Sequence, residues 1–262
     1  TQIAEYLVQM GYPVILKTRD PGNVEGIISK IRKRLSKRLQ EQEVEECLEN
    51  LVITTDYADL SDVDIIIEAS KEDLDVKKDV FAELSGVCKT TTIFATNSSS
   101  LSIDALAAVT DRPEQFIGLH FFNPVHRMDL IEVVVGSNTS DETKKFAINL
   151  AHDLKKQPIL VKNSPGFIVN RLLLPQINEA IRLLGDGIAS KEDIDSAVKL
   201  GLNHPMGPFE LADFIGLDIC LSILEVLHAG LGDDHFEPAP LLREMVEEGK
   251  LGYKSGEGFY TY

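Results

Sequence analysis

The feature that most constrains the fold is a series of short apolar runs that alternate with longer amphipathic segments through the first half of the chain. The runs are VDIIIEAS (63–70), TTTIFAT (90–96), FIGLHF (116–121), LIEVVV (130–135) and PILVKN (158–163). Short, nearly continuous apolar runs are typical of strands buried on both faces, and the stretches between them, such as KKDVFAELSGVC, have helical spacing. This alternation predicts a doubly wound, Rossmann-like α/β domain with a parallel sheet.

The start of the chain predicts a helix, a strand and a helical excursion. IAEYLVQMG reads as the end of a helix closed by Gly11, YPVILK reads as a strand, and residues 22–50 are polar with apolar residues at helical spacing. A doubly wound sheet usually carries a Gly-rich turn between its first strand and first helix. We expect that strand and turn to precede Thr1, because the sequence opens inside what looks like the first helix.

The second half of the chain shows only helical periodicities. We therefore predict a dinucleotide-binding domain over 1–163 and an all-helical domain over 164–262, with the boundary near NSPGF. The segments PQINEAIRLLGDGI and FELADFIGLDICLSILEVL carry more apolar residues than one small bundle needs to bury. This excess agrees with the homodimer that the family resemblance described below implies.

Composition excludes several kinds of partner. The formal net charge of -16 over 262 residues argues against nucleic-acid and anionic-membrane binding, which need a basic surface. No apolar run reaches the roughly 20 residues of a membrane-spanning helix. Cys47, Cys88 and Cys220 are far apart and form no CxxC pair, so neither a disulfide framework nor a metal site is expected. We expect a reducing cytoplasm.

Polar side chains follow several predicted strands. ATNSSSL places Asn97 and three serines after one strand, and HFFNP follows another, where open α/β sheets present ligand-binding loops. Glu132 lies inside an apolar run and needs a partner if it is buried, and His120, twelve residues upstream, is the obvious one. PGFIVNR predicts that Asn170 lies one to two turns into a helix begun by Pro165 and Gly166.

Taken singly, these residues have simpler interpretations. A lone histidine near a strand end is more often structural, and Glu132 could be a strand-edge carboxylate that faces water. Asn170 could satisfy nearby backbone groups. The serines after Asn97 could cap the helix that follows them.

Longer motifs carry a family resemblance over essentially the whole chain. They are ATNSSSLSI, GLHFFNPV, DLIEVV, NSPGFIVNRLLLP with INEAIRLL, DIDSAVKLGLNHPMGPFELADFIGLD and LGYKSGEGFYTY. Their order and spacing are similar to those of the short-chain L-3-hydroxyacyl-CoA dehydrogenases, and most similar to the bacterial 3-hydroxybutyryl-CoA dehydrogenases. The resemblance implies an oxidoreductase that interconverts 3-hydroxyacyl-CoA and 3-ketoacyl-CoA with a nicotinamide cofactor, in fatty acid and butyrate metabolism.

The resemblance also implies roles for individual residues. His120 would be the general base, and Glu132 would orient its imidazole and stabilise the positive form. Ser99 and Asn170 would hydrogen-bond the reacting oxygen atoms. The residues implied to contact the cofactor are Glu72, Lys77, Asn97 and Asn123.

A basic cluster stands out against the acidic whole. It comprises Lys30, Arg32, Lys33, Arg34, Lys37 and Arg38. It could be a solvated helix face balanced by the following EQEVEE. In the resembled family this region contacts coenzyme A, so Lys30 and Lys33 are predicted to bind its phosphates.

The end of the second predicted strand departs from the NAD-binding pattern. Where NAD-preferring members have an aspartate for the ribose hydroxyls, this chain has Thr18, followed by Arg19. This chemistry favours NADP, unless Asp20 reaches the ribose and preserves NAD use. The chain could instead be a dehydrogenase of a free hydroxy acid, or an inactive binding module that keeps the fold. The sequence leaves acyl-chain length and physiological direction open.

Overall fold

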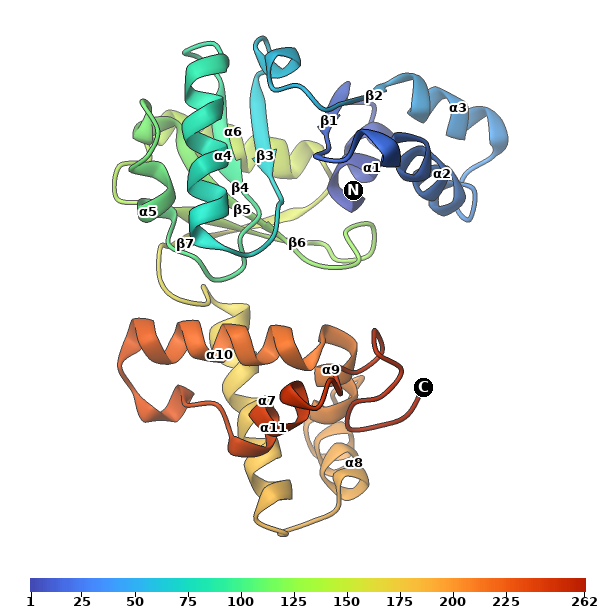
Figure 1. Cartoon of the computed structure of the whole chain (residues 1–262), viewed down its shortest axis with the longest axis vertical. Helices are drawn as coiled ribbons and strands as arrows, with labels where there is room; N and C mark the ends of the chain where they lie inside the picture. Colours follow the sequence, from blue (N-terminus) through green and yellow to red (C-terminus); the bar gives the residue numbers. More distant parts are fainter. The chain divides into compact units, whose positions relative to one another are not determined.

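The computed structural model describes residues 1–262, which divide into two compact units (Figure 1). Unit 1 comprises Thr1–Ser98 and Ser102–Asn163, and unit 2 comprises Ser99–Leu101 and Ser164–Tyr262. Unit 1 is α/β and unit 2 is helical, so the predicted fold class is confirmed.

The first part of unit 1 is a small α/β layer. Its elements are α1 (Gln2–Gln9), β1 (Val14–Lys17), η1 (Pro21–Asn23), α2 (Val24–Leu35), α3 (Glu41–Glu49) and β2 (Leu51–Thr54). Strands β1 and β2 are parallel and pair only with each other. The predicted helical excursion is the α2–α3 hairpin, whose apolar side chains pack on α1 through Ile31, Leu35 and Val8.

The second part of unit 1 contains a five-stranded sheet in the order β3-β4-β5-β6-β7. Its elements are η2 (Ala58–Leu60), β3 (Ile65–Glu68), α4 (Leu74–Val87), β4 (Ile93–Thr96), α5 (Ile103–Ala107), η3 (Pro113–Gln115), β5 (Phe116–Phe121), β6 (Leu130–Val135), α6 (Asp141–Asp153) and β7 (Gln157–Lys162). All neighbouring strands are parallel except β5 and β6, which are antiparallel. The prediction of a wholly parallel sheet is therefore wrong for this pair. The link over 122–129 is too short for a parallel crossover, which needs about a dozen residues or more.

Helices cover both faces of this sheet. Leu119 and Ile131 point to one face, where they pack with α6 residues such as Leu150. On the other face, the Phe81 ring of α4 lies 4.7 Å from the Phe116 ring. Because alternate residues of a strand share a face, His120 points to the same face as Phe116.

Unit 2 is a helical bundle around one core. Its helices are α7 (Val169–Gly185), α8 (Lys191–Leu202), α9 (Pro208–Ile215), α10 (Leu217–Leu231), η4 (Asp234–Phe236) and α11 (Pro240–Glu247). Their buried faces meet through residues such as Leu174, Phe209 and Leu224. No single helix of the chain is long and apolar enough to cross a membrane, and α9 and α10 reach that composition only together, across a 96° bend.

The start of α7 differs from the prediction. The helix begins at Val169, so Pro165 and Gly166 do not open it, and Asn170 is its second residue. Gly166 and Phe167 have φ values of +70° and +51°. A left-handed pair ends any helical path, so the chain turns before the helix starts. A Cβ at Gly166 would lie 2.6 Å from the Leu227 side chain, which restricts this position to glycine.

Candidate active site

His120 and Glu132 form a buried pair across two strands of unit 1. They are direct register partners on antiparallel β5 and β6, which explains their spacing of twelve residues. The His120 Nδ1 atom lies 2.7 Å from Glu132 Oε2, and the two residues are 6% and 1% exposed. The carboxylate accepts a hydrogen bond from Nδ1–H. The other ring nitrogen, Nε2, is therefore the one that can exchange a proton with a ligand. The water-facing interpretation of Glu132 is therefore wrong, because the side chain is buried against its partner.

Ser99 and Asn170 meet within unit 2. The side-chain nitrogen of Asn170 donates to the backbone oxygen of Ser99 at 3.1 Å. Asn170 thus satisfies a backbone group, but one 71 residues away and not in its own helix. Of the four predicted catalytic residues, the structure brings together one pair in each unit. Ser102, farther along the same segment, is the N-cap of α5 and accepts from Ala105 N.

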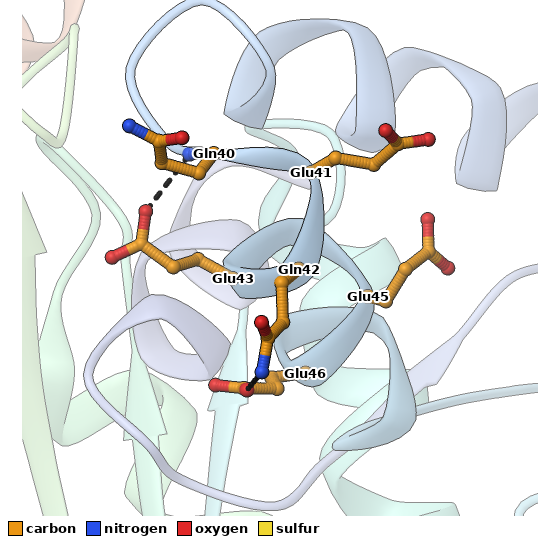
Figure 2. Close-up of a pocket in the computed structure, with 6 residues that line it drawn as sticks. All are labelled: Gln40, Glu41, Gln42, Glu43, Glu45 and Glu46. Carbon is orange, nitrogen blue, oxygen red and sulfur yellow. Dashed lines mark hydrogen bonds between the residues drawn. The ribbon is translucent and has the colours of Figure 1, made fainter.

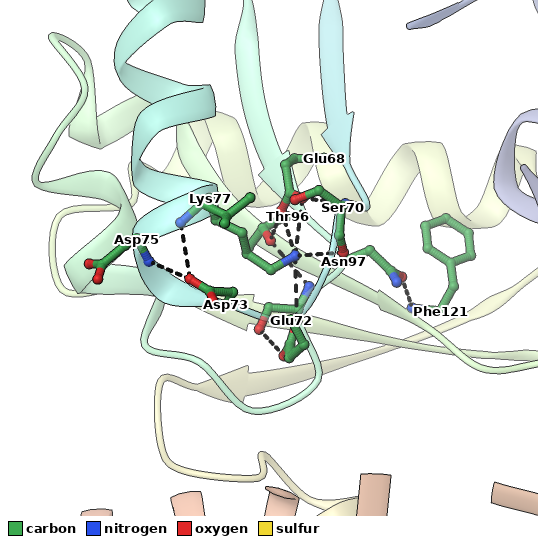
Figure 3. Close-up of polar contacts among 11 residues, drawn as sticks. Glu68, Ser70, Glu72, Asp73, Asp75, Lys77, Thr96, Asn97 and Phe121 are labelled. Carbon is green, nitrogen blue, oxygen red and sulfur yellow. Dashed lines mark hydrogen bonds and ion pairs between the residues drawn. The ribbon is translucent and has the colours of Figure 1, made fainter. Parts of the chain in front are cut away.

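The predicted cofactor residues Glu72 and Lys77 belong to a polar network at the carboxyl ends of β3 and β4 (Figure 3). Lys77 Nζ lies 3.4 Å from Glu72 Oε2, but it bonds Glu68 more closely, at 2.9 and 3.0 Å. Glu72 also accepts from the Ser98 hydroxyl at 2.5 Å. Glu68 was not singled out from the sequence. Like Glu132, it is an acidic residue next to an apolar run, here the three isoleucines 65–67.

Asn97 and Asn123 hold loops next to this network. The Asn97 side-chain oxygen accepts from Phe121 N at 2.9 Å and so joins the ends of β4 and β5. The Asn123 side-chain oxygen accepts from Gln2 Nε2 at 2.8 Å, which ties the loop after β5 to the start of α1. Both amides therefore serve the fold of unit 1, whatever they bind.

The residues after β1 have separate local contacts. Thr18 extends the pairing with β2 by donating its N–H to Thr54 O, and Arg19 is exposed. The Asp20 carboxylate accepts from Gly22 N at 2.9 Å as the cap of η1. Thr18 and Arg19 thus follow the strand end directly, whereas Asp20 already has a structural partner.

The basic cluster on and after α2 divides into two kinds of residue. Arg34 and Arg38 both bind the buried Glu5 carboxylate at 2.6 Å, and Arg32 pairs with Glu45. The interpretation of a face balanced by EQEVEE therefore fits Arg32, whereas Arg34 and Arg38 are used by Glu5, which lies outside that segment. The remaining members are exposed and make no ion pair: Lys30, Lys33 and Lys37.

A hollow beside the start of α3 is acidic. It is lined by Gln40, Glu41, Gln42, Glu43, Glu45 and Glu46 (Figure 2). The Gln40 N–H donates to Glu43 in a capping box, so part of this polarity starts the helix. Four carboxylates repel phosphates, and none of these residues is a predicted catalytic or cofactor residue. No group of His, Cys, Asp and Glu side chains in the chain is arranged to hold a metal ion.

A doubly wound unit with a buried His–Glu pair, followed by a helical unit, defines a dehydrogenase with a nicotinamide cofactor. The family model of the 3-hydroxyacyl-CoA dehydrogenase NAD binding domain matches residues 1–164, and the model of the 3-hydroxyacyl-CoA dehydrogenase C-terminal domain matches residues 166–262. The chain belongs to the 3-hydroxyacyl-CoA dehydrogenase family and is an oxidoreductase of that family.

Individual relatives agree with this assignment. A probable 3-hydroxybutyryl-CoA dehydrogenase of Deinococcus radiodurans is 46% identical, with 99% of this chain and 95% of the relative covered. The human mitochondrial hydroxyacyl-coenzyme A dehydrogenase is 42% identical over 99% of this chain and 87% of its own length. The crystal structure of (S)-3-hydroxybutyryl-CoA dehydrogenase PaaH1 from Ralstonia eutropha superposes with a TM-score of 0.94 at 44% identity, covering 100% of this chain and 94% of that one.

The carboxyl ends of β3 to β5 fit a nicotinamide cofactor. The Ser70 hydroxyl oxygen is buried there and has no hydrogen-bond partner in the protein. A buried hydroxyl of this kind is costly unless a ligand or water satisfies it. Together with the Glu72 carboxylate, it offers a donor and an acceptor suited to ribose hydroxyls and a carboxamide. When bound, the cofactor supplies the acceptor or donor of a hydride.

Proposed function

We propose that the protein interconverts short-chain 3-hydroxyacyl-CoA and 3-ketoacyl-CoA, with 3-hydroxybutyryl-CoA as the four-carbon substrate. The observation that carries the proposal is the buried His120–Glu132 pair at 2.7 Å. In oxidation, His120 Nε2 takes the 3-hydroxyl proton while the C3 hydrogen leaves with its electron pair to the cofactor. The C3–O bond becomes a carbonyl, and Glu132 stabilises the imidazolium that forms. Family membership favours this reaction over an inactive module or a free hydroxy acid as substrate.

The proposed roles of Ser99 and Asn170 concern the substrate oxygen atoms. Asn170 carries two amide N–H groups and uses one for Ser99 O, so the second can serve a ligand. Donors of this kind stabilise negative charge as it develops on the reacting oxygen atoms.

The experiment that tests the function follows reduction of acetoacetyl-CoA, with acetoacetate as the control substrate. Turnover of the thioester with little turnover of the free acid supports the proposal. Turnover of the free acid alone would make the protein a dehydrogenase of free hydroxy acids. Absence of turnover with both substrates would leave the inactive-module interpretation.

The proposed cofactor preference is for NADP, because Thr18 and Arg19 replace the aspartate that repels a 2'-phosphate. Their positions directly after β1 support this, as does the use of Asp20 as the η1 cap. We expect NADPH to be used in preference to NADH, and Thr18→Asp to reverse the ratio of kcat/KM. If the ratio of kcat/KM for NADPH and NADH were unchanged in Thr18→Asp, residues other than Thr18 would determine the choice of cofactor.

The proposed coenzyme A contacts are Lys30 and Lys33, which are exposed and make no ion pair. Reversing both charges, as in Lys30→Glu with Lys33→Glu, should raise KM for acetoacetyl-CoA about tenfold, as expected from lost phosphate pairing. The N-acetylcysteamine thioester of acetoacetate lacks the phosphates, so its KM should not change. Lys145→Glu makes the same kind of charge change on α6 and serves as the control. An unchanged KM for acetoacetyl-CoA would remove these residues from the site.

We also propose that the protein is a cytoplasmic homodimer that associates through unit 2. Large apolar side chains of unit 2 are exposed, among them Leu172 at 72% and Leu200 at 87%. The three cysteines are free, which suits a reducing compartment. Light scattering tests the mass in solution, and a monomer at micromolar concentration would contradict the proposal.

A further inference from the structure

Glu68 is the most heavily bonded side chain of the network at the end of β3. Its carboxylate accepts from Lys77 Nζ through both oxygens, from Thr96 Oγ1 at 2.8 Å and from Ser70 N. Its backbone oxygen accepts from Asn97 N at 2.8 Å. Glu68 is only 5% exposed, so these donors replace the water that a carboxylate would otherwise bind.

Glu68 holds the lysine that lies beside Glu72. Lys77 is in the first turn of α4 and is 1% exposed, so its ammonium needs hydrogen-bonding partners in place of water. Glu68 contacts that ammonium at 2.9 Å and Glu72 at 3.4 Å. The closer carboxylate therefore fixes the position of Lys77, and Lys77 in turn attracts Glu72.

Glu68 also holds the segment that leads to Ser99. Thr96 Oγ1 donates to Glu68 and accepts from Ser98 N at 3.1 Å, so the carboxylate acts on the Ser98 backbone through one hydroxyl. The Ser98 side chain donates to Glu72, the second carboxylate of the network. Thr96 and Asn97 are thus bonded to Glu68 directly (Figure 3), and Ser98 is tied to it through Thr96.

We propose that Glu68 is a positioning residue of the dehydrogenase, which sets Glu72 for cofactor binding and sets the backbone before Ser99. This inference rests on the proposed function, because the roles of Glu72 and Ser99 come from it. In this proposal Glu68 acts through Lys77 and Thr96 rather than on the reacting atoms. Two carboxylates share one ammonium, so the network keeps a net negative charge at the edge where the nicotinamide cofactor binds.

The lowered pKa of Glu68 agrees with an ionised carboxylate at neutral pH. Burial by itself raises the pKa of the Glu68 carboxyl, but the Lys77 ammonium and the hydrogen bond from the Ser70 backbone N–H hold it below its ordinary value. The ionised Glu68 carboxylate keeps its ion pair with Lys77. Loss of this charge would leave Glu72 as the only carboxylate on the ammonium and draw it away from Ser98.

The experiment compares Glu68→Gln and Glu68→Asp with the intact protein. The readouts are the Kd of the reduced cofactor from its fluorescence, the KM values of cofactor and acetoacetyl-CoA, kcat and Tm. We expect Glu68→Gln to raise the cofactor Kd about tenfold or more and to lower kcat, with KM for acetoacetyl-CoA changed less than about twofold. Glu68→Asp keeps the charge and should restore the Kd to within about threefold.

A matched control separates positioning from stability. Asp195→Asn removes a buried carboxylate from unit 2, and it should change Tm without changing the cofactor Kd. If Glu68→Gln lowers Tm but keeps the cofactor Kd and kcat of the intact protein, the carboxylate is structural and the proposal is overturned.

A second variant tests the relay if Glu68→Gln does not fold. Thr96→Val removes the hydroxyl between Glu68 and Ser98 but leaves the ion pair, so it should lower kcat more than it raises the cofactor Kd. An unchanged kcat would overturn the proposal. Failure of the proposed function is recognised separately, because the intact protein itself would then not turn over acetoacetyl-CoA.

Discussion

The two units bury carboxylates in different ways. In unit 1, Glu68 and Glu132 lie against nitrogen groups that carry or can acquire positive charge, Lys77 and His120. In unit 2, Asp195 and Asp213 are each 1% exposed and have no cationic partner within bonding distance. Their oxygens are satisfied by N–H and O–H donors that do not change charge.

The donors to Asp213 come from the end of the chain. Asp213 accepts from Phe259 N, Tyr260 N and the Tyr262 hydroxyl, each at 2.9 Å. A Cβ at Gly258 would lie 2.0 Å from the Asp213 carboxylate, so a glycine is required there for the close approach. This carboxylate fastens the C-terminal segment to α9.

The comparison shows that the partner decides what a buried carboxylate does. Backbone and hydroxyl donors hold a chain segment in place. A lysine keeps a charge fixed, and a histidine allows the charge to change during a reaction. Substitutions in the two units should therefore affect different quantities: activity in unit 1 and stability in unit 2.

The largest effect should come from the pair whose charge changes. His120→Gln keeps an amide that can donate to Glu132 but removes the general base, so kcat should fall about 10²–10⁴-fold. Steady-state kinetics measures this, and the cofactor Kd and circular dichroism spectrum should stay as in the intact protein. A fall in kcat of less than tenfold would contradict the difference between the two units, because His120 would then have a structural role like that of the unit 2 carboxylates.

Asp213→Ala should lower the free energy of unfolding by about 3 kcal/mol, since it leaves buried N–H groups of Phe259 and Tyr260 without an acceptor. Urea denaturation measures this loss, and kcat should be retained at temperatures where the variant is folded. Tyr262→Phe removes only one of the donors and should cost about 1 kcal/mol. If Asp213→Ala abolished activity in the folded protein, Asp213 would have a role in catalysis, which would contradict the comparison.

The smallest effect is an opposite pH dependence of stability at Glu68 and Asp195. The pKa of Glu68 is lowered from 4.5, because Lys77 and Ser70 outweigh burial, so its stabilisation is present above about pH 4.5 and is lost as pH falls through the lowered value. The pKa of Asp195 is raised from 3.8, because burial outweighs its hydrogen bonds. Its contribution is therefore present below about pH 3.8 and is lost as pH rises through the raised value.

Unfolding free energies measured between pH 3 and pH 7 test both signs. Glu68→Gln should reduce the acid loss of stability, and Asp195→Asn should reduce the loss that accompanies rising pH. Slopes of the same sign in both variants would contradict the contrast between ion-paired and hydrogen-bonded carboxylates.

Much of the fold could be predicted from local patterns. The apolar runs around Ile66, Phe94 and Leu119 are strands, and the change to helical periodicity falls where unit 2 takes up the chain. Periodicity reports which residues avoid water but not the direction of a neighbouring strand, so the antiparallel β5–β6 pair was missed. The left-handed turn at Gly166 and Phe167 was also not predicted, because phenylalanine is not a residue that usually marks a positive φ.

The sequence by itself determined the α/β and helical halves, the strand segments and the expectation that Glu132 needs His120. These depend on local apolar spacing and on the cost of burying a charge, which hold in any fold. Only the tertiary structure decided that Glu68 joins Lys77, Thr96 and Glu72. It also decided that Arg34 and Arg38 are used by Glu5, while Lys30 and Lys33 stay exposed. Such contacts join residues far apart in the chain, and their geometry follows from strand register and helix packing, which no local pattern encodes.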